Sequence, residues 1–186
     1  MTVFWESIKF PEACEPSWES AFEELFLANY GPLVNTLVRI VGDRGQAEEI
    51  SADAFYRLYT LRPDRGRQQN HAGWVYRVAM NLALDALRSK VRRLHRETEA
   101  EREASSAKTP DALDALLAEE QRARVRSVLA RLKPAQAQIL ILGSDGRSYR
   151  EVAVMLGMKT DSIYTLVCRA RARFEREYLK LYGGRP

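Results

Sequence analysis

A row of polar and cationic side chains near the C-terminus has the chemistry needed to bind DNA. The row recurs along one side of a helical pattern and contains Ser162, Tyr164, Thr165, Arg169 and Arg173. Hydroxyl and guanidinium groups hydrogen-bond to base edges, and arginine also holds phosphate oxygens. Side chains of these types, on one face of a helix, are typical of a helix that enters the DNA major groove.

Two short amphipathic helices are expected to position this row. The first carries Val152, Ala153 and Leu156 and ends at Gly157, which tolerates the left-handed backbone of a sharp turn. The second is predicted to begin with Thr160 as its N-cap. Its apolar positions follow at the helical period, at Ile163, Val167, Ala170 and Phe174. The pattern predicts a helix-turn-helix, although a solvated helical hairpin with an arginine-rich face gives the same pattern.

Composition indicates a globular protein without a metal or disulfide framework. Of the 186 residues, 46% are hydrophobic and 29% are charged, and the pI of about 9.2 weakly favours a polyanionic partner. Cys14 and Cys168 are far apart and only His71 and His95 accompany them, so neither a zinc site nor another cofactor is expected. Without a signal peptide or a membrane-spanning run, the sequence predicts a cytoplasmic protein with no membrane partner.

The first half of the chain reads as an N-terminal arm followed by helices. Residues 1–17 form the arm, to which no function is assigned. A helical pattern then starts at Ser17, and Gly31-Pro32 is expected to divide or kink it. A second helix is predicted from Gln46 to Leu61, with an acidic outer stripe. By composition alone, an ordinary solvated face is the better explanation of that stripe.

A polar loop and a third helix complete the first half. The loop covers residues 62–73 and has almost no apolar content, so it must be exposed. The third helix is predicted over residues 74–93 and ends in a strongly basic segment, which suits the dipole of a helix C-terminus. Its mixed aromatic and basic surface also suits stacking on single-stranded bases.

The apolar pattern disappears after the third helix and returns near residue 113. Residues 96–112 are acidic and rich in small residues, which predicts a flexible linker. The helical pattern then continues to Lys133-Pro134, followed by a short helix and the helix-turn-helix. We therefore predict an all-α protein with two small helical domains, residues 18–95 and 113–182, joined by the acidic linker and followed by a tail, residues 183–186.

Taken in order along the chain, several short sequence segments resemble those of a known family. The matching positions are Ala47-Glu48-Glu49-Ile50, Phe55, Trp74, Tyr76-Arg77, Asn81, Asp85, Arg88, Leu132-Lys133-Pro134, Ser148 to Ala153, and Arg169-Ala170-Arg171. Over about residues 20–180 the chain resembles the extracytoplasmic-function (ECF) members of the sigma-70 family, the small two-domain sigma factors of bacterial RNA polymerase.

The resemblance implies roles for the first domain. Glu48, Glu49 and Asp53 match the surface that binds core RNA polymerase. The loop matches the segment that captures a flipped base of the melted non-template strand, and the third helix matches the surface that lines this strand. The implied minus-ten residues are Arg62, Arg65, Arg67, Asn70, Trp74, Tyr76, Asn81, Asp85, Arg88 and Arg92.

The second domain matches the reader of the minus-thirty-five element in duplex promoter DNA. Base reading is assigned to Ser162, Tyr164, Thr165, Cys168 and Arg169, and phosphate binding to Lys159, Arg171 and Arg173. Leu166, where the family usually has a basic residue, is expected in the core. The linker resembles a segment that threads toward the RNA channel. The family is commonly held inactive by an anti-sigma factor, which is therefore an expected partner.

The sequence leaves two classes of function to separate. The leading hypothesis is a promoter-specificity subunit that binds core polymerase and has no catalytic centre. The alternative is a stand-alone helix-turn-helix regulator, which would need a dimer surface to read two half-sites. An enzyme is not a leading hypothesis, because the sequence shows no catalytic Ser/His/Asp set, no glycine-rich phosphate-binding loop and no cluster of metal-ligating residues.

Overall fold

The computed structural model describes residues 17–62, 70–101 and 113–184. Within these ranges the regular elements are all α-helices and no strand occurs, which confirms the predicted all-α class. The apolar run at residues 139–142, which could have formed a strand, lies inside a helix. No helix of the described ranges is long and apolar enough to cross a lipid bilayer.

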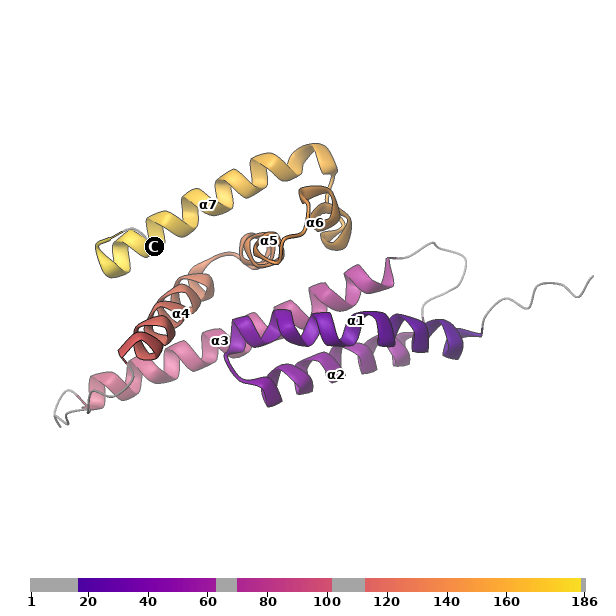
Figure 1. The fold of residues 1–186 in the computed structure, drawn as a ribbon, viewed down its shortest axis with the longest axis horizontal. Coiled ribbons are helices and arrows are strands. Elements are labelled where there is room, and N and C mark those ends of the chain that lie inside the picture. Colours follow the sequence, from indigo (N-terminus) through magenta and orange to yellow (C-terminus); the bar gives the residue numbers. More distant parts are fainter. Residues whose placement is uncertain (1–16, 63–69, 102–112, 185–186) are drawn as a thin grey trace, which may run out of the picture.

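Three helices run side by side as an N-terminal unit (Figure 1): α1 (Trp18–Val41), α2 (Arg44–Leu61) and α3 (His71–Glu101). The side chains of Ser17 and Asp43 accept hydrogen bonds from backbone N–H groups in the first turns of α1 and α2. The apolar positions predicted from the helical period meet between the three helices and are buried there, including Leu33, Leu37, Phe55, Leu58 and Leu87.

Pro32 does not divide α1. The helix is continuous through this residue, although a proline inside a helix removes one hydrogen bond and costs about 3 kcal/mol. Leu33 and Leu37 are fully buried and Ile40 is 1% exposed. Each such side chain contributes about 1.5–3 kcal/mol on burial, and all three lie in the continuation of the helix beyond Pro32. Packing therefore outweighs the local cost, and of the expected division or kink the division does not occur.

Helix α3 is longer at both ends than the sequence predicted. Asn70 caps it by accepting a hydrogen bond from the N–H of Gly73 at 2.7 Å, so Gly73 is helical and not part of the loop. At the other end, residues 96–101, the first six of the predicted linker, are helical. The remainder of that linker, residues 102–112, lies outside the described residues, as does the N-terminal arm up to residue 16.

Four helices form the C-terminal unit: α4 (Leu113–Arg131), α5 (Pro134–Ser144), α6 (Tyr149–Leu156) and α7 (Thr160–Tyr182). Pro134 stands in the first turn of α5, where its missing N–H costs nothing, as predicted. At the far end, Gly183 adopts a left-handed backbone and ends α7.

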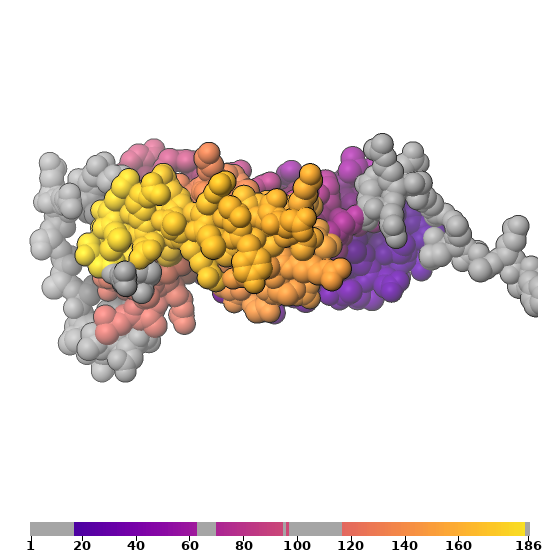
Figure 2. All heavy atoms as spheres, turned by 90° about the horizontal axis from the view of Figure 1, so that it is seen from above, coloured from indigo at the N-terminus to yellow at the C-terminus, as the bar shows by residue number. Residues whose placement is uncertain are grey.

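The two units pack directly on each other. Helix α3 contacts α4, α5 and α6, so the C-terminal unit lies along the N-terminal unit (Figures 1 and 2). One continuous cluster of buried apolar residues joins them, with Leu84 and Leu87 on one side and Leu129, Leu132 and Leu142 on the other. The sequence predicted two helical domains, but it did not predict that they would share a core.

Candidate nucleic-acid interface

The turn of the helix-turn-helix is fixed at both ends of α6. A capping box starts the helix, in which Ser148 and Glu151 exchange hydrogen bonds between side chain and backbone at 3.3 and 2.7 Å. Gly157 ends it with a φ of 64°, and the N–H of Met158 then donates to the carbonyl of Ala153 at 2.8 Å. The left-handed role predicted for Gly157 is confirmed.

Helix α7 starts one residue earlier than the predicted cap would place it. Lys159 is the N-cap, with an extended backbone, and Thr160 is already helical, so the prediction for Thr160 is wrong by one residue. A lysine ammonium cannot accept a hydrogen bond, and the Lys159 side chain makes no capping bond. The predicted core positions of α7 are buried at Ile163, Val167 and Ala170, and Leu166 packs against the core as expected.

The polar face of α7 points to solvent. Its base-reading candidates are all exposed: Ser162, Tyr164, Thr165, Cys168 and Arg169. The Tyr164 side chain is 67% exposed, and its ring lies edge-on to that of Tyr149 with 4.8 Å between centroids. This contact holds the Tyr164 ring at the surface of α7, the helix on the side of the molecule seen in Figure 2.

The three residues to which phosphate binding was assigned on α7 and at its start differ in exposure and in the partners that their side chains already have. Lys159 is exposed. Arg171 is exposed and donates to the Tyr149 hydroxyl at 3.3 Å. Arg173 is half-buried and forms an ion pair with Glu177 at 3.0 Å, and the Glu177 side chain is only 9% exposed. Arg173 would have to leave this pair before it could hold a phosphate.

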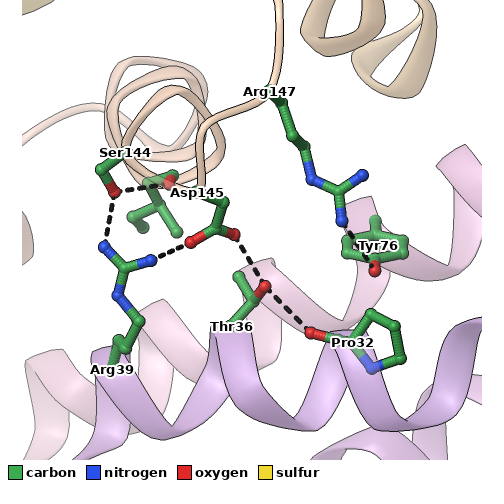
Figure 3. A network of polar contacts seen from close by, with 8 residues as sticks. Pro32, Thr36, Arg39, Tyr76, Ser144, Asp145 and Arg147 are labelled. Carbon is green, nitrogen blue, oxygen red and sulfur yellow. Dashed lines mark hydrogen bonds and ion pairs between the residues drawn. The ribbon is translucent and has the colours of Figure 1, made fainter.

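The second candidate face lies on α3, and the C-terminal unit covers much of it. Asn70 donates from Nδ2 to the carbonyl of Val154 at 2.7 Å. Tyr76, expected at the surface, is 1% exposed. The Arg147 guanidinium lies 5.2 Å from the Tyr76 ring centroid and donates to its hydroxyl at 3.1 Å (Figure 3). Burial raises the pKa of the Tyr76 phenol, which the neighbouring Arg147 offsets in part.

Two further candidates on α3 also bond to the C-terminal unit. The Asn81 side-chain oxygen accepts from Gln138 Nε2 at 2.8 Å. Arg88 donates from Nε to the carbonyl of Ala130 and from Nη2 to the carbonyl of Leu132, both at 3.1 Å, and also pairs with Asp85. These bonds use the groups that were assigned to the melted strand.

The remaining candidates near α3 are more open. Asp85 and Arg92 are exposed, and Arg92 donates to Ser89 Oγ at 3.0 Å. Trp74 is half-buried against the core. At the end of α2, Arg62 has a left-handed backbone, lies 5.8 Å from the Tyr59 ring centroid and pairs with Glu19 at 3.6 Å. Arg65 and Arg67 lie outside the described residues.

The acidic stripe of α2 faces outward but is partly neutralised. Glu48 pairs with Arg44 at 2.9 Å, and Asp53 binds Arg57 through both carboxylate oxygens. Glu49 is exposed. In the part of the chain that the structure describes, no group of acidic, histidine or cysteine side chains could hold a metal ion.

Ser51 of α2 is fully buried and donates to the carbonyl of Ala47 at 2.8 Å. It therefore supports the core of the N-terminal unit and does not add to the acidic surface.

Sequence reasoning missed a polar network between α1 and the turn that precedes α6. The Asp145 carboxylate accepts from Thr36 Oγ1 at 2.8 Å and forms an ion pair with Arg39, which also donates to Ser144 Oγ at 2.8 Å (Figure 3). Thr36 and Asp145 are 109 residues apart, so no local signal could have paired them.

Two family models match the chain, and they correspond to the two units. "Sigma-70 region 2" matches residues 25–93, and "Sigma-70, region 4" matches residues 122–174. The first match covers most of α1 to α3 and the second runs from α4 into α7. Both candidate faces, on α3 and on α7, lie inside the matched segments.

Curated relatives carry sigma-factor names. The chain is 31% identical over 146 residues to "Probable ECF RNA polymerase sigma factor SigI" of Mycobacterium tuberculosis, covering 76% of this chain and 50% of that protein. It is 25% identical to "ECF RNA polymerase sigma factor SigE" of Mycolicibacterium smegmatis, covering 90% of this chain and 63% of that protein. The chain thus spans about half the length of the first relative.

A solved structure is also similar, that of the sigma factor RpoE in complex with the anti-sigma factor NepR from Bartonella quintana. The likeness has a TM-score of 0.45 and 23% identity and covers 87% of this chain and 98% of that one. On the two family matches and the named relatives, the chain belongs to the ECF subfamily of the sigma-70 family.

Proposed function

We propose that this chain is a promoter-specificity subunit of bacterial RNA polymerase. The observation that carries the proposal is that one chain has two separate helix faces suited to nucleic acid, the exposed polar face of α7 and the aromatic and basic face of α3. A regulator that binds only duplex DNA needs the first face and has no use for the second.

Helix α7 is assigned to the duplex minus-thirty-five element. Its exposed residues Ser162, Thr165 and Arg169 lie within the first three turns, the part of a recognition helix that reaches base edges in the major groove. Lys159 and Arg171 flank them and supply phosphate contacts, which fix position and carry no sequence information.

Helix α3 is assigned to the minus-ten element. Melting this element requires bases to leave the stack, which costs a few kcal/mol per flipped base and must be offset by stacking and hydrogen bonding in a pocket. The Trp74 side chain offers an aromatic surface on which a base can stack, and Arg92 offers a cation for the phosphate backbone of the strand. These are the two requirements for binding a single strand. Asn81 and Arg88, which lie between Trp74 and Arg92 in the sequence, supply hydrogen-bond donors.

The acidic side of α2, with Glu48, Glu49 and Asp53, is assigned to core polymerase. Charged side chains on the rim of an interface mainly steer association and fix its register. The proposal gives the chain no catalytic step, because the polymerase performs the chemistry. It places the protein in the cytoplasm, where the polymerase acts, with an anti-sigma factor as a further partner.

Run-off transcription with core polymerase on a library of promoters tests the proposal directly. We expect the chain to direct initiation at a defined subset of the library and to copurify with core polymerase. A chain that binds duplex DNA but neither binds core polymerase nor directs initiation would instead be a stand-alone regulator.

The Arg169→Ala variant tests the assigned face of α7. A base contact is worth about 1–3 kcal/mol, or roughly a 5- to 150-fold loss at the preferred upstream base, and core binding should persist. Arg176→Ala is the matched control, because Arg176 is exposed on the same helix two turns farther along. Unchanged promoter selection by Arg169→Ala would refute the assignment.

A further inference from the structure

We infer that Tyr149 is a positioning residue for DNA reading: its ring holds Tyr164 toward a base edge, and its hydroxyl holds Arg171 toward the phosphate backbone. The inference rests on the proposed function for the assignment of α7 to duplex DNA, and on the structure for the two contacts. It gives α6, which carries none of the predicted DNA-reading residues, control over two side chains of α7.

The start of α6 fixes the position of Tyr149. Tyr149 is the first residue of this helix and directly follows Ser148, the N-cap of the capping box with Glu151. Its half-buried side chain packs against the apolar core. Capping and packing together restrict the backbone and the ring of Tyr149, so it offers a rigid contact to the side chains of α7.

The ring of Tyr149 contacts an exposed side chain of α7. The Tyr164 side chain is 67% exposed, and the two ring centroids lie 4.8 Å apart at an interplanar angle of 79°. Aromatic pairs prefer this edge-to-face geometry because the positive edge of one ring meets the negative face of the other. An exposed side chain otherwise samples several rotamers, and ordering it when DNA binds costs free energy. The Tyr149 ring orders Tyr164 before DNA arrives.

The hydroxyl of Tyr149 contacts a second side chain of α7. Arg171 lies about two turns beyond Tyr164 on the same side of the helix, and its Nη2 donates to the Tyr149 hydroxyl oxygen at 3.3 Å. A guanidinium has five N–H donors, so the donors not used here can hold a phosphate. Because the acceptor is a neutral hydroxyl, this bond orients Arg171 without neutralising its charge.

Arg173 shows the opposite arrangement on the same helix. Its partner is the Glu177 carboxylate at 3.0 Å, which also pairs with Lys180 at 3.7 Å and belongs to a side chain that is only 9% exposed. An anionic partner competes with a phosphate for the guanidinium, whereas the Tyr149 hydroxyl only sets the direction of its arginine. Of these two arginines, Arg171 is therefore the one positioned for DNA.

The two contacts of Tyr149 act on different components of DNA recognition. Base contacts discriminate among sequences, whereas phosphate contacts strengthen binding to every sequence. Loss of the Tyr149 ring should therefore reduce discrimination at one base pair, and loss of its hydroxyl should reduce affinity for all duplexes. A merely structural role would instead lower the stability of the fold and leave base preference unchanged.

Two substitutions separate the ring of Tyr149 from its hydroxyl. Tyr149→Phe removes only the hydroxyl, and Tyr149→Leu removes both groups while keeping an apolar side chain against the core. Tyr178→Phe is the matched control, because it removes a hydroxyl that donates to Gln121 near the far end of α7. Each Tyr149 variant is also combined with Tyr164→Ala or Arg171→Ala, so that double-mutant cycles isolate the two contacts.

The ring is tested by base preference. The full chain selects from a pool of labelled duplexes with one randomised segment, and anisotropy gives its affinity for the selected duplexes and their single-base variants. Tyr164→Ala identifies the base pair that Tyr164 reads. At that pair, Tyr149→Leu should reduce discrimination about 2- to 12-fold, the range expected for one aromatic pair, with no further loss in the Tyr164→Ala background.

The hydroxyl is tested by affinity for the same duplexes. Tyr149→Phe should weaken binding to all of them by about 2- to 5-fold, as for one hydrogen bond, and should leave base preference unchanged. The loss should disappear in the Arg171→Ala background. Tyr178→Phe should match the wild type in affinity and in base preference.

Additive losses in both cycles would overturn the inference, and so would a Tyr164→Ala variant with the base preference of the wild type. Circular dichroism checks folding; if Tyr149→Leu does not fold, the cycle of Tyr149→Phe with Arg171→Ala decides. The proposed function can fail separately. A chain that shows both couplings but neither binds core polymerase nor directs initiation supports the inference and refutes the promoter role, whereas normal initiation with additive losses refutes the inference alone.

Discussion

Replacing Gly157 by alanine tests how the turn sets the recognition helix. Gly157 has a φ of 64°, a left-handed backbone that costs an alanine roughly 1–2 kcal/mol. The new Cβ would also lie 2.9 Å from Nη1 of Arg77. That atom is the end of a flexible side chain, so it can move, but it then gives up its long hydrogen bond to the Leu156 carbonyl.

The expected cost is therefore about 1–2 kcal/mol, most of it backbone strain, and it falls on the junction of α6 and α7. A change of this size raises the equilibrium constant for local opening by roughly 5- to 30-fold. Amide hydrogen exchange reports local opening residue by residue, so the buried amides of Val152 and Ala153 should exchange faster by that factor. Duplex binding through α7 should weaken in parallel.

Two controls separate strain from the mere addition of a methyl group. Gly183→Ala imposes the same strain, at a φ of 68°, but at the last turn of α7, where fraying relieves it. Gly31→Ala adds a methyl without strain. Gly157→Asn should fall between the wild type and alanine, because asparagine tolerates the left-handed region. If Gly157→Ala leaves exchange in α6 unchanged, the turn does not carry the stability assigned to it.

Three further predictions concern single contacts. Arg88→Lys keeps the cation but cannot bond two carbonyls in a fork. Losing one charge-assisted bond of about 1.5 kcal/mol should favour separation of the N-terminal and C-terminal units about tenfold, measured by small-angle X-ray scattering. Burial raises the pKa of Tyr76, so the stability that the buried neutral phenol contributes is fully present below pH 10 and is lost as pH rises through the raised pKa. In a titration followed by tyrosinate absorbance, one tyrosine should ionise at higher pH than the others, and Tyr76→Phe should remove this late step. Hydrogen bonds from Ser148 lower the pKa of Glu151. The stability that this capping interaction gives to α6 is therefore fully present above pH 4.5 and is lost as pH falls through the lowered pKa. The amide chemical shifts of α6 should follow this titration, and Glu151→Gln should remove it.

The helix-turn-helix was predictable because its signals are local. Val152, Ala153, Ile163 and Val167 follow the helical period, and their burial depends on α6 and α7 meeting each other across a turn that Gly157 makes possible. The error at the start of α7 has the same local origin. A threonine at residue 160 looks like a cap, but the chain already enters the helix there, after an extended Lys159.

The covered face of α3 was not predictable for the opposite reason. Arg88 lies on the polar side of its helix when the first half is considered alone, so the helical period assigns it to solvent. Tyr76 shares the side of Met80 and Leu87, and only the resemblance assigned it to an exposed surface. Their partners Arg147 and Leu132 follow 71 and 44 residues later. Helical periodicity identifies the apolar side of each helix, but it cannot say that a polar side will meet a second unit.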